Sequence, residues 1–179
     1  MNKRIFKNTE WSILICVLIL LAIGLVALYS ATIDSELDEF KKQCTWILIA
    51  IPIMIGIIYI DYSVIVRFSP YLYGLSIILL IAVLFTPAVN GATSWFNIGF
   101  FAFQPAELAK VFVIMFLSYV IVEIQKKSRK EVNKISKLAV IFAAISLPLL
   151  LIVLQPDYGT AIAYVISLVL ILYVAGIDK

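Results

Sequence analysis

The stretch that decides the fold is WSILICVLILLAIGLVALYSA, residues 11–31. It holds 21 residues and no charged side chain. A transmembrane helix needs about 20 consecutive apolar residues to cross the hydrocarbon core of a bilayer. A cleavable secretory signal has a shorter apolar core, of about 7–15 residues, followed by a small-x-small cleavage site. The end of this stretch, Tyr29-Ser30-Ala31, is a poor site of that kind. Residues 11–31 are therefore predicted to be a first membrane span that is retained.

Further long apolar runs follow along the chain, and the composition agrees with them. Hydrophobic residues make up 64% of the 179 residues and charged residues 14%, and the mean hydropathy is +1.10. A soluble domain of this size could not bury so much apolar surface, and the runs lack the alternation of membrane β-strands. The sequence predicts an all-α, polytopic membrane helical bundle, a single domain over residues 1–179. Its expected six spans are residues 11–31, 45–60, 71–89, 105–122, 138–154 and 158–177.

The placement of lysine and arginine predicts the orientation of the spans. With the N-terminus in the cytoplasm, 11 of the 14 basic residues fall in cytoplasmic segments. Only Lys41 and Lys42 fall outside, and Lys110 lies within a span. This bias follows the positive-inside rule, so the N-terminus is expected to be cytoplasmic. Residues 126–137 hold six of the cytoplasmic charges and are interpreted as a topology determinant, or as a contact for anionic lipid head groups or a cytoplasmic partner.

The reactive side chains available to this chain are few. It has no histidine, and its two cysteines, Cys16 and Cys44, do not have the spacing of metal ligands. The predicted topology places these cysteines near opposite faces of the membrane, too far apart for a disulfide. Both are expected to be unpaired thiols. No metal site is predicted and no cofactor motif is evident, although the sequence leaves a divalent cation open.

Glu107 and Lys110 are charged residues within the predicted span 105–122. Each charge inside a membrane costs roughly 2.5–3.5 kcal/mol on insertion scales, and such residues mark functional sites by default. Their i, i+3 spacing places both on one face of a helix, and Gln104 extends this polar stripe to the outer surface. The pair is interpreted either as an ion pair that fastens the helix into the bundle, or as part of an outward-opening cavity for a phosphate or sugar group.

Two segments predicted to lie at the outer surface complete the set of candidates. Residues 88–104 are rich in aromatic side chains, among them Trp95, and contain two glycines. They are interpreted as an aromatic belt, or as a structured loop folded onto the outer ends of the spans. The turn QPDYGT, residues 155–160, separates the last two spans. Asp157 in this turn could cap the following helix or serve catalysis.

Together these segments resemble a known family. The carrying motifs are GATSW at residues 91–95, GFFAFQPAELAK at residues 99–110 and QPDYGTA at residues 155–161, with weaker similarity around residues 24–31 and 42–46. They resemble the signatures of the SEDS family (shape, elongation, division and sporulation) of bacterial cell-wall polymerases. The amino acids at residues 60–62 and 99–101 are more similar to the RodA branch than to the FtsW division branch.

The resemblance implies a multi-pass protein of the bacterial cell membrane with peptidoglycan glycosyltransferase activity. Such enzymes polymerise lipid II into glycan strands beside a class B penicillin-binding protein. The motif matches carry over the candidate site residues Gln104, Glu107, Lys110 and Asp157, with Trp95 as a shaping residue. No nucleic-acid partner is expected.

The resemblance also has a limit. Family members have roughly ten spans, and the acidic residue regarded as their catalytic base lies in a later outer loop. No catalytic residue is therefore assigned in this chain, and no polymerase activity is expected from these 179 residues alone. A lipid II flippase, or a noncatalytic membrane fragment that binds a partner or lipid II, stays open as an alternative function.

Overall fold

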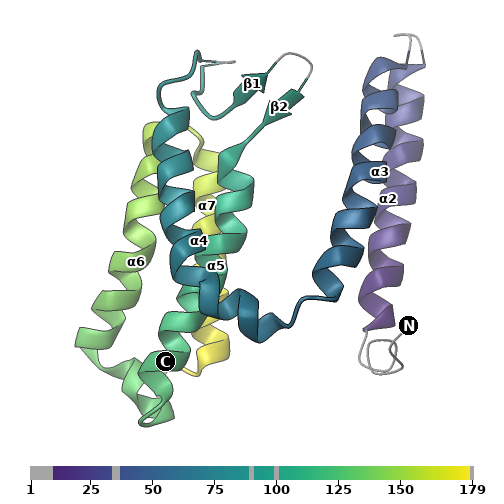
Figure 1. Cartoon of the computed structure of the whole chain (residues 1–179). Coiled ribbons are helices and arrows are strands. Elements are labelled where there is room, and N and C mark those ends of the chain that lie inside the picture. The colour runs from purple at the N-terminus through teal and green to yellow at the C-terminus, as the bar shows by residue number, and fades with distance from the viewer. Residues whose placement is uncertain (1–9, 34–36, 89–90, 99–100, 178–179) are drawn as a thin grey trace. The chain divides into compact units, whose positions relative to one another are not determined.

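The structure is a computed structural model that describes residues 10–33, 37–88, 91–98 and 101–177. The side chains of Ile98 and Phe101 are also outside the description. Six α-helices, a two-stranded hairpin and a short 3-10 helix make up the described chain (Figure 1). In chain order they are α2 (Trp11–Thr32), α3 (Asp38–Ile58), α4 (Tyr62–Val83), β1 (Phe96–Ile98), β2 (Phe101–Phe103), α5 (Pro105–Gln125), η1 (Arg129–Asn133), α6 (Ile135–Leu154) and α7 (Tyr158–Ala175).

Each of the six predicted spans overlaps a helix of the structure. By length and composition, five helices are able to cross a membrane, namely α2, α3, α4, α6 and α7. The sixth helix, α5, has a similar length of 21 residues and carries Glu107 and Lys110. The start of α3 extends past its predicted span, where charges are paired. Thus α3 begins at Asp38, before the predicted span 45–60, because its first turn carries an i, i+3 ion pair between Asp38 and Lys41.

By internal contacts the chain divides into two compact units, residues 1–61 and 62–179. The first unit is the helix pair α2–α3. None of the residues of α3 is buried, and Thr32 is the only buried residue of α2. Cys16 and Cys44 are both free thiols, as predicted. Apolar side chains that are exposed on a membrane helix are solvated by lipid, so this pair needs no core of its own.

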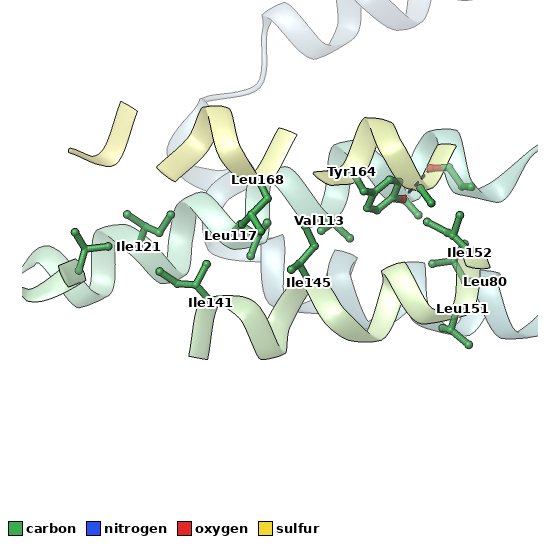
Figure 2. Packing of buried hydrophobic residues seen from close by; sticks show 14 residues of the cluster. Leu80, Val113, Leu117, Ile121, Ile141, Ile145, Leu151, Ile152, Tyr164 and Leu168 are labelled. Atoms are coloured by element: carbon green, nitrogen blue, oxygen red, sulfur yellow. Dashed lines mark hydrogen bonds between the residues drawn. The ribbon is translucent and has the colours of Figure 1, made fainter. Parts of the chain in front are cut away.

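The second unit contains a packed core built around α5. Its buried residues recur at Ala109, Val113, Leu117 and Ile121, one helical turn apart. Figure 2 shows this stripe meeting buried side chains of the neighbouring helices. The helix contacts α4, α6, α7 and η1. In a membrane, helices associate through close packing and hydrogen bonds, because lipid tails are as apolar as the side chains. The fully buried Ala106 and Ala109 permit that close approach.

The segment before α5 is a structured loop, in agreement with one of the two interpretations of residues 88–104. Strands β1 and β2 pair antiparallel, with Phe96 opposite Phe103. These two short strands were not predicted from the sequence. Gly91, the first residue of the described range 91–98, has a φ of +85°, a backbone conformation that glycine adopts without strain. The loop leads directly into Gln104 and the first turn of α5.

Candidate functional site

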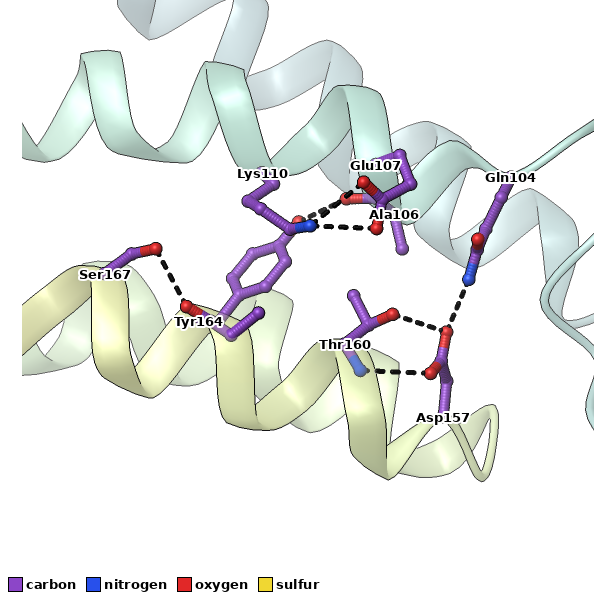
Figure 3. Close-up of polar contacts among 9 residues, drawn as sticks. Gln104, Ala106, Glu107, Lys110, Asp157, Thr160, Tyr164 and Ser167 are labelled. Carbon is purple, nitrogen blue, oxygen red and sulfur yellow. Dashed lines mark hydrogen bonds and ion pairs between the residues drawn. The ribbon is translucent and has the colours of Figure 1, made fainter. Parts of the chain in front are cut away.

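The two motifs, which are far apart in the sequence, meet at the N-terminal ends of α5 and α7. The amide Nε2 of Gln104 donates a hydrogen bond to Oδ2 of Asp157, with a distance of 2.6 Å (Figure 3). Gln104 is the N-cap residue of α5, in an extended conformation, and Pro105 occupies the first helical position. Proline suits that position because its missing N–H would have no helical partner. The side chain of Gln104 does not cap its own helix, so it is available to reach across to α7.

Asp157 caps α7, which confirms the first of the two roles considered for it. Its Oδ1 accepts from the backbone N–H of Thr160 at 3.1 Å, and its Oδ2 accepts from the hydroxyl of Thr160 at 2.8 Å. With Gln104, three donors engage this carboxylate. A negative charge at this position also interacts favourably with the positive end of the helix dipole. Asp157 thereby joins the start of two helices through one side chain.

Glu107 and Lys110 form the predicted ion pair. Lys110 Nζ lies 2.8 Å from Oε1 and 3.0 Å from Oε2 of Glu107. The lysine side chain is 23% exposed and the glutamate side chain 57% exposed. Both side chains lie on the side of α5 that faces α7 in Figure 3, in line with Gln104. The geometry holds an ammonium group one to two turns below the Gln104–Asp157 contact.

Tyr164 provides a second link between these helices that sequence reasoning missed. Its hydroxyl donates to the backbone carbonyl of Ala106 at 2.9 Å, and its side chain is almost fully buried. At the opposite end of the helices, Gln125 Nε2 donates to the carbonyl of Ala175 at 2.8 Å. Helices α5 and α7 are therefore parallel neighbours. A tyrosine in the middle of an apolar span is a usable signal, since a buried phenol needs a hydrogen-bond partner.

Gln155, the first residue of the second motif, was also missed as a structural residue. It is fully buried and its Nε2 donates to the carbonyl of Leu80, at 3.1 Å. The hydroxyl of Ser94 in turn donates to the backbone carbonyl of Gln155, at 3.4 Å. These bonds tie the α6–α7 turn to α4 and to the loop before β1. The motif residues therefore join three segments beside Asp157.

The remaining predicted features are placed as follows. Trp95 lies in the loop before β1 and is 36% exposed. Gly99 and Phe100 of the first motif lie outside the described residues. Three grooves in the described chain are lined by residues other than Glu107 and Lys110, so the outward-opening hollow beside that pair stays a prediction. Among the described residues, no group of three or more acidic, histidine or cysteine side chains is placed to hold a metal ion.

Known proteins resemble this chain along nearly its whole length. RodA of Treponema pallidum (strain Nichols), named a peptidoglycan glycosyltransferase, is 32% identical over 181 residues, which cover 98% of this chain and 41% of that protein. The crystal structure of RodA, the rod shape determining protein of Thermus thermophilus, superimposes with a TM-score of 0.84 at 26% identity. This match covers 96% of this chain and 55% of the RodA chain.

A further solved structure is a peptidoglycan synthase complex, described by its coordination of polymerization and crosslinking. One of its chains matches with a TM-score of 0.83 at 26% identity, over 94% of this chain and 48% of that chain. The chain thus spans less than half the length of the curated RodA relative that it matches.

A match to a protein-family model establishes the family of this chain. Residues 10–179 match the family model of FtsW, RodA and SpoVE, described as cell cycle proteins. This match includes every predicted span and both central motifs. Together with the membrane-spanning helices, it makes the chain a multi-pass protein of the bacterial cell membrane. The family resemblance inferred from the motifs is therefore confirmed, and the chain belongs to the FtsW, RodA and SpoVE family of cell cycle proteins.

Proposed function

We propose that this chain contributes the N-terminal part of a RodA-type peptidoglycan glycosyltransferase, which polymerises lipid II into glycan strands for cell-wall elongation and cell shape. The observation that carries the proposal is the joining of two motifs at one site. Gln104 of the first motif donates directly to Asp157 of the second, in a fold that matches RodA. The name of the Treponema relative supports the same activity.

The proposed role of Lys110 is to stabilise negative charge on the diphosphate of the substrate. Preorganised cations that face a developing charge are a major source of catalytic rate. The bidentate contact with Glu107 aims the ammonium group and keeps it on the α7 side of α5. The outer position follows from the predicted topology, in which α5 begins at the outer face. We therefore assign Lys110 to substrate binding or charge stabilisation, and no general base to this chain.

The proposed role of Asp157 and Gln104 is to position this site. Asp157 accepts hydrogen bonds from Gln104 at the start of α5 and from Thr160 at the start of α7, and these bonds join the ends of the two helices. A class B penicillin-binding protein is the proposed partner, because a peptidoglycan synthase complex contains a chain of the same fold. Copurification of such a protein with this chain would support that part of the proposal.

A chimera tests the function directly. Residues 1–179 replace the matching N-terminal segment of Treponema pallidum RodA, and the purified chimera receives purified lipid II in detergent. Glycan strands are then resolved on a gel. We expect polymer from the chimera and none from residues 1–179 alone. A flippase would yield no polymer in this assay, because it transports lipid II across a membrane and forms no glycosidic bond.

Substitution of Lys110 sharpens the test. In the chimera, Lys110→Ala is expected to lower the polymerisation rate by about 100-fold, as expected for the loss of one transition-state donor. Lys110→Arg should restore little of the rate, since the guanidinium differs from an ammonium in shape and hydration. The matched control is Lys41→Ala. It breaks another i, i+3 ion pair, with Asp38, which is distant in the sequence from Lys110. Full activity of the Lys110→Ala chimera would contradict the proposed role.

A further inference from the structure

A groove runs between α5 and α7 near their C-terminal ends, at the opposite end from Gln104 and Asp157. Its volume is about 390 Å³. Two polar side chains, Ser118 and Gln125, also line it, but both use their donors internally. Ser118 donates to the carbonyl of Ile114 and Gln125 to that of Ala175. The groove therefore offers apolar contacts to an occupant. The apolar side chains that line it are Ile121, Val122, Leu170, Ile171, Val174 and Ala175.

A basic segment is folded against the end of this groove. The 3-10 helix η1 is capped by Ser128, and its Val132 is fully buried in the core of the second unit. The side chain of Gln125, which lines the groove, also donates to the carbonyl of Arg129, at 3.4 Å. The segment is thus held in place by buried contacts and a hydrogen bond. Its charges have a defined position relative to the groove.

Arg129 lies beside the end of the groove. Its Nε and Nη2 atoms lie 3.2 and 3.3 Å from the position that a Cβ atom would occupy on Gly176. Gly176 directly follows Ala175, which lines the groove, and ends α7 in a left-handed conformation. The guanidinium group therefore lies over the C-terminal end of α7, where a cation also interacts favourably with the helix dipole.

The basic segment has more positive charge than its own carboxylates can balance. Residues 123–137 contain six lysine or arginine residues and two glutamates. The two glutamates pair with Lys126 and Lys134. Among the described residues, no ion pair engages Arg129, Lys127 or Lys130. A surplus of cations beside an apolar groove matches an amphiphile with a negatively charged head.

We propose that this groove and η1 together bind one anionic phospholipid of the inner leaflet. One acyl chain would lie in the groove, and the phosphate would meet Arg129 and its neighbouring lysines. Guanidinium groups bind phosphate oxygens in a two-pronged geometry. The lining side chains of Val122 and Val174 are 59% and 76% exposed, so the groove is open at the surface of the described chain. The positive-inside rule places this end of the bundle at the cytoplasmic head groups, where anionic lipids attract basic segments.

Native mass spectrometry of the purified chain in detergent tests this proposal. The chain is titrated with phosphatidylglycerol and, in parallel, with phosphatidylcholine of the same acyl chains. We expect one phosphatidylglycerol per chain, bound several-fold more tightly than phosphatidylcholine. Arg129→Gln should weaken phosphatidylglycerol binding about fivefold, the value of one cation near an anionic membrane surface.

A second pair of variants tests the groove. Val174→Trp fills it and should also weaken phosphatidylglycerol binding several-fold. Val169→Trp is the matched control, on an exposed position of the same helix that does not line the groove. Lys41→Gln is the control for charge, at the predicted outer face. Neither control should change the affinity.

Several outcomes would overturn the proposal. Equal retention of the two lipids would show that the head group is not recognised, and unchanged binding in Arg129→Gln would remove the assigned contact. Unchanged binding in Val174→Trp would exclude the groove. Loss of a dimer peak in Val174→Trp would show that a second copy of the chain occupies the groove in place of a lipid.

Discussion

The parallel helices α5 and α7 are joined at both ends by a glutamine side chain, but to different acceptors. At the N-terminal end, Gln104 donates to the carboxylate of Asp157, at 2.6 Å. At the C-terminal end, Gln125 donates to the backbone carbonyl of Ala175, at 2.8 Å. The difference follows from helix polarity. The first turn of a helix has free N–H groups and the last turn has free carbonyls, so only the first turn needs an acceptor from a side chain.

The two ends of the helices also differ in the sign of the charge that they attract. The N-terminal end attracts a carboxylate, and Asp157 supplies it for α7. The C-terminal end attracts a cation, and Arg129 lies over Gly176 there. The proposed catalytic site and the proposed lipid site therefore occupy opposite ends of the same pair of helices. Asp157 and Arg129 each have the sign of charge that the adjacent end of α7 favours.

The largest effect on this comparison is expected from Asp157→Ala. The change removes the cap of α7 and leaves Gln104 without its acceptor, so we expect a loss of about 2 kcal/mol in the free energy of unfolding. SDS titration in mixed micelles, followed by circular dichroism, measures it. Asp157→Asn keeps one oxygen acceptor and should lose less. Equal stability of Asp157→Ala and the parent chain would contradict the capping geometry.

A smaller loss of stability is expected from Gln104→Leu. This change removes the uncharged donor of the hydrogen bond to Asp157 and leaves the cap of α7 intact. We expect a loss of about 1.5 kcal/mol, in the range of hydrogen bonds to charged groups. The double variant with Asp157→Ala gives a coupling energy by the same SDS titration. A coupling energy near zero would mean that the two side chains do not depend on each other.

Gln125→Leu probes the opposite end and should cost less still. Its acceptor is a neutral backbone carbonyl, and hydrogen bonds between membrane helices are worth about 0.6 kcal/mol on average. The same titration compares this variant with Gln104→Leu. A larger loss at Gln125 than at Gln104 would reverse the comparison and indicate that the charged acceptor adds nothing.

The smallest effect concerns pH at the basic segment. The hydrogen bond from Lys134 lowers the pKa of Glu131 from its ordinary value near 4.5, and the nearby Lys127 and Lys137 act in the same direction. Because the pKa is lower in the folded state, this stabilisation is present above the ordinary value and is lost as the pH falls through the lowered pKa. Stability measured from about pH 6 to about pH 3 should therefore fall less steeply in Glu131→Gln. An identical slope would contradict the pairing.

The helices were predictable from the sequence, but their ends were less so. Long apolar runs predict spans because lipid is the only medium that accepts them. The prediction treated charges as limits, whereas α3 continues through the paired Asp38 and Lys41. The third predicted span, residues 71–89, likewise begins later than α4, which starts at Tyr62 and includes Arg67 in its second turn. A long cationic side chain can extend from a helix to the membrane surface, so a single arginine need not end a helix.

Within the site, the separation in sequence between the two partners of a contact decided whether that contact could be predicted. The Glu107–Lys110 pair and the cap by Asp157 involve residues three positions apart in the chain. Both follow from the geometry of a single helix. The hydrogen bond between Gln104 and Asp157 spans 53 positions. Both residues were candidates from the sequence, but their contact was not predicted. Residue Tyr164 was missed for the same reason, since its acceptor lies 58 positions away.

The amino-acid sequence by itself determined the membrane class, the helical content, the local ion pair on α5 and the family. These properties depend on hydropathy and on contacts within one helical turn, which backbone geometry sets without reference to other helices. The tertiary structure decided that α5 and α7 run parallel, that Gln104 meets Asp157, and that Arg129 lies beside an apolar groove. Helix packing in a membrane depends on close fit and hydrogen bonds between distant residues. The apolar pattern of any one span predicts neither this fit nor these hydrogen bonds.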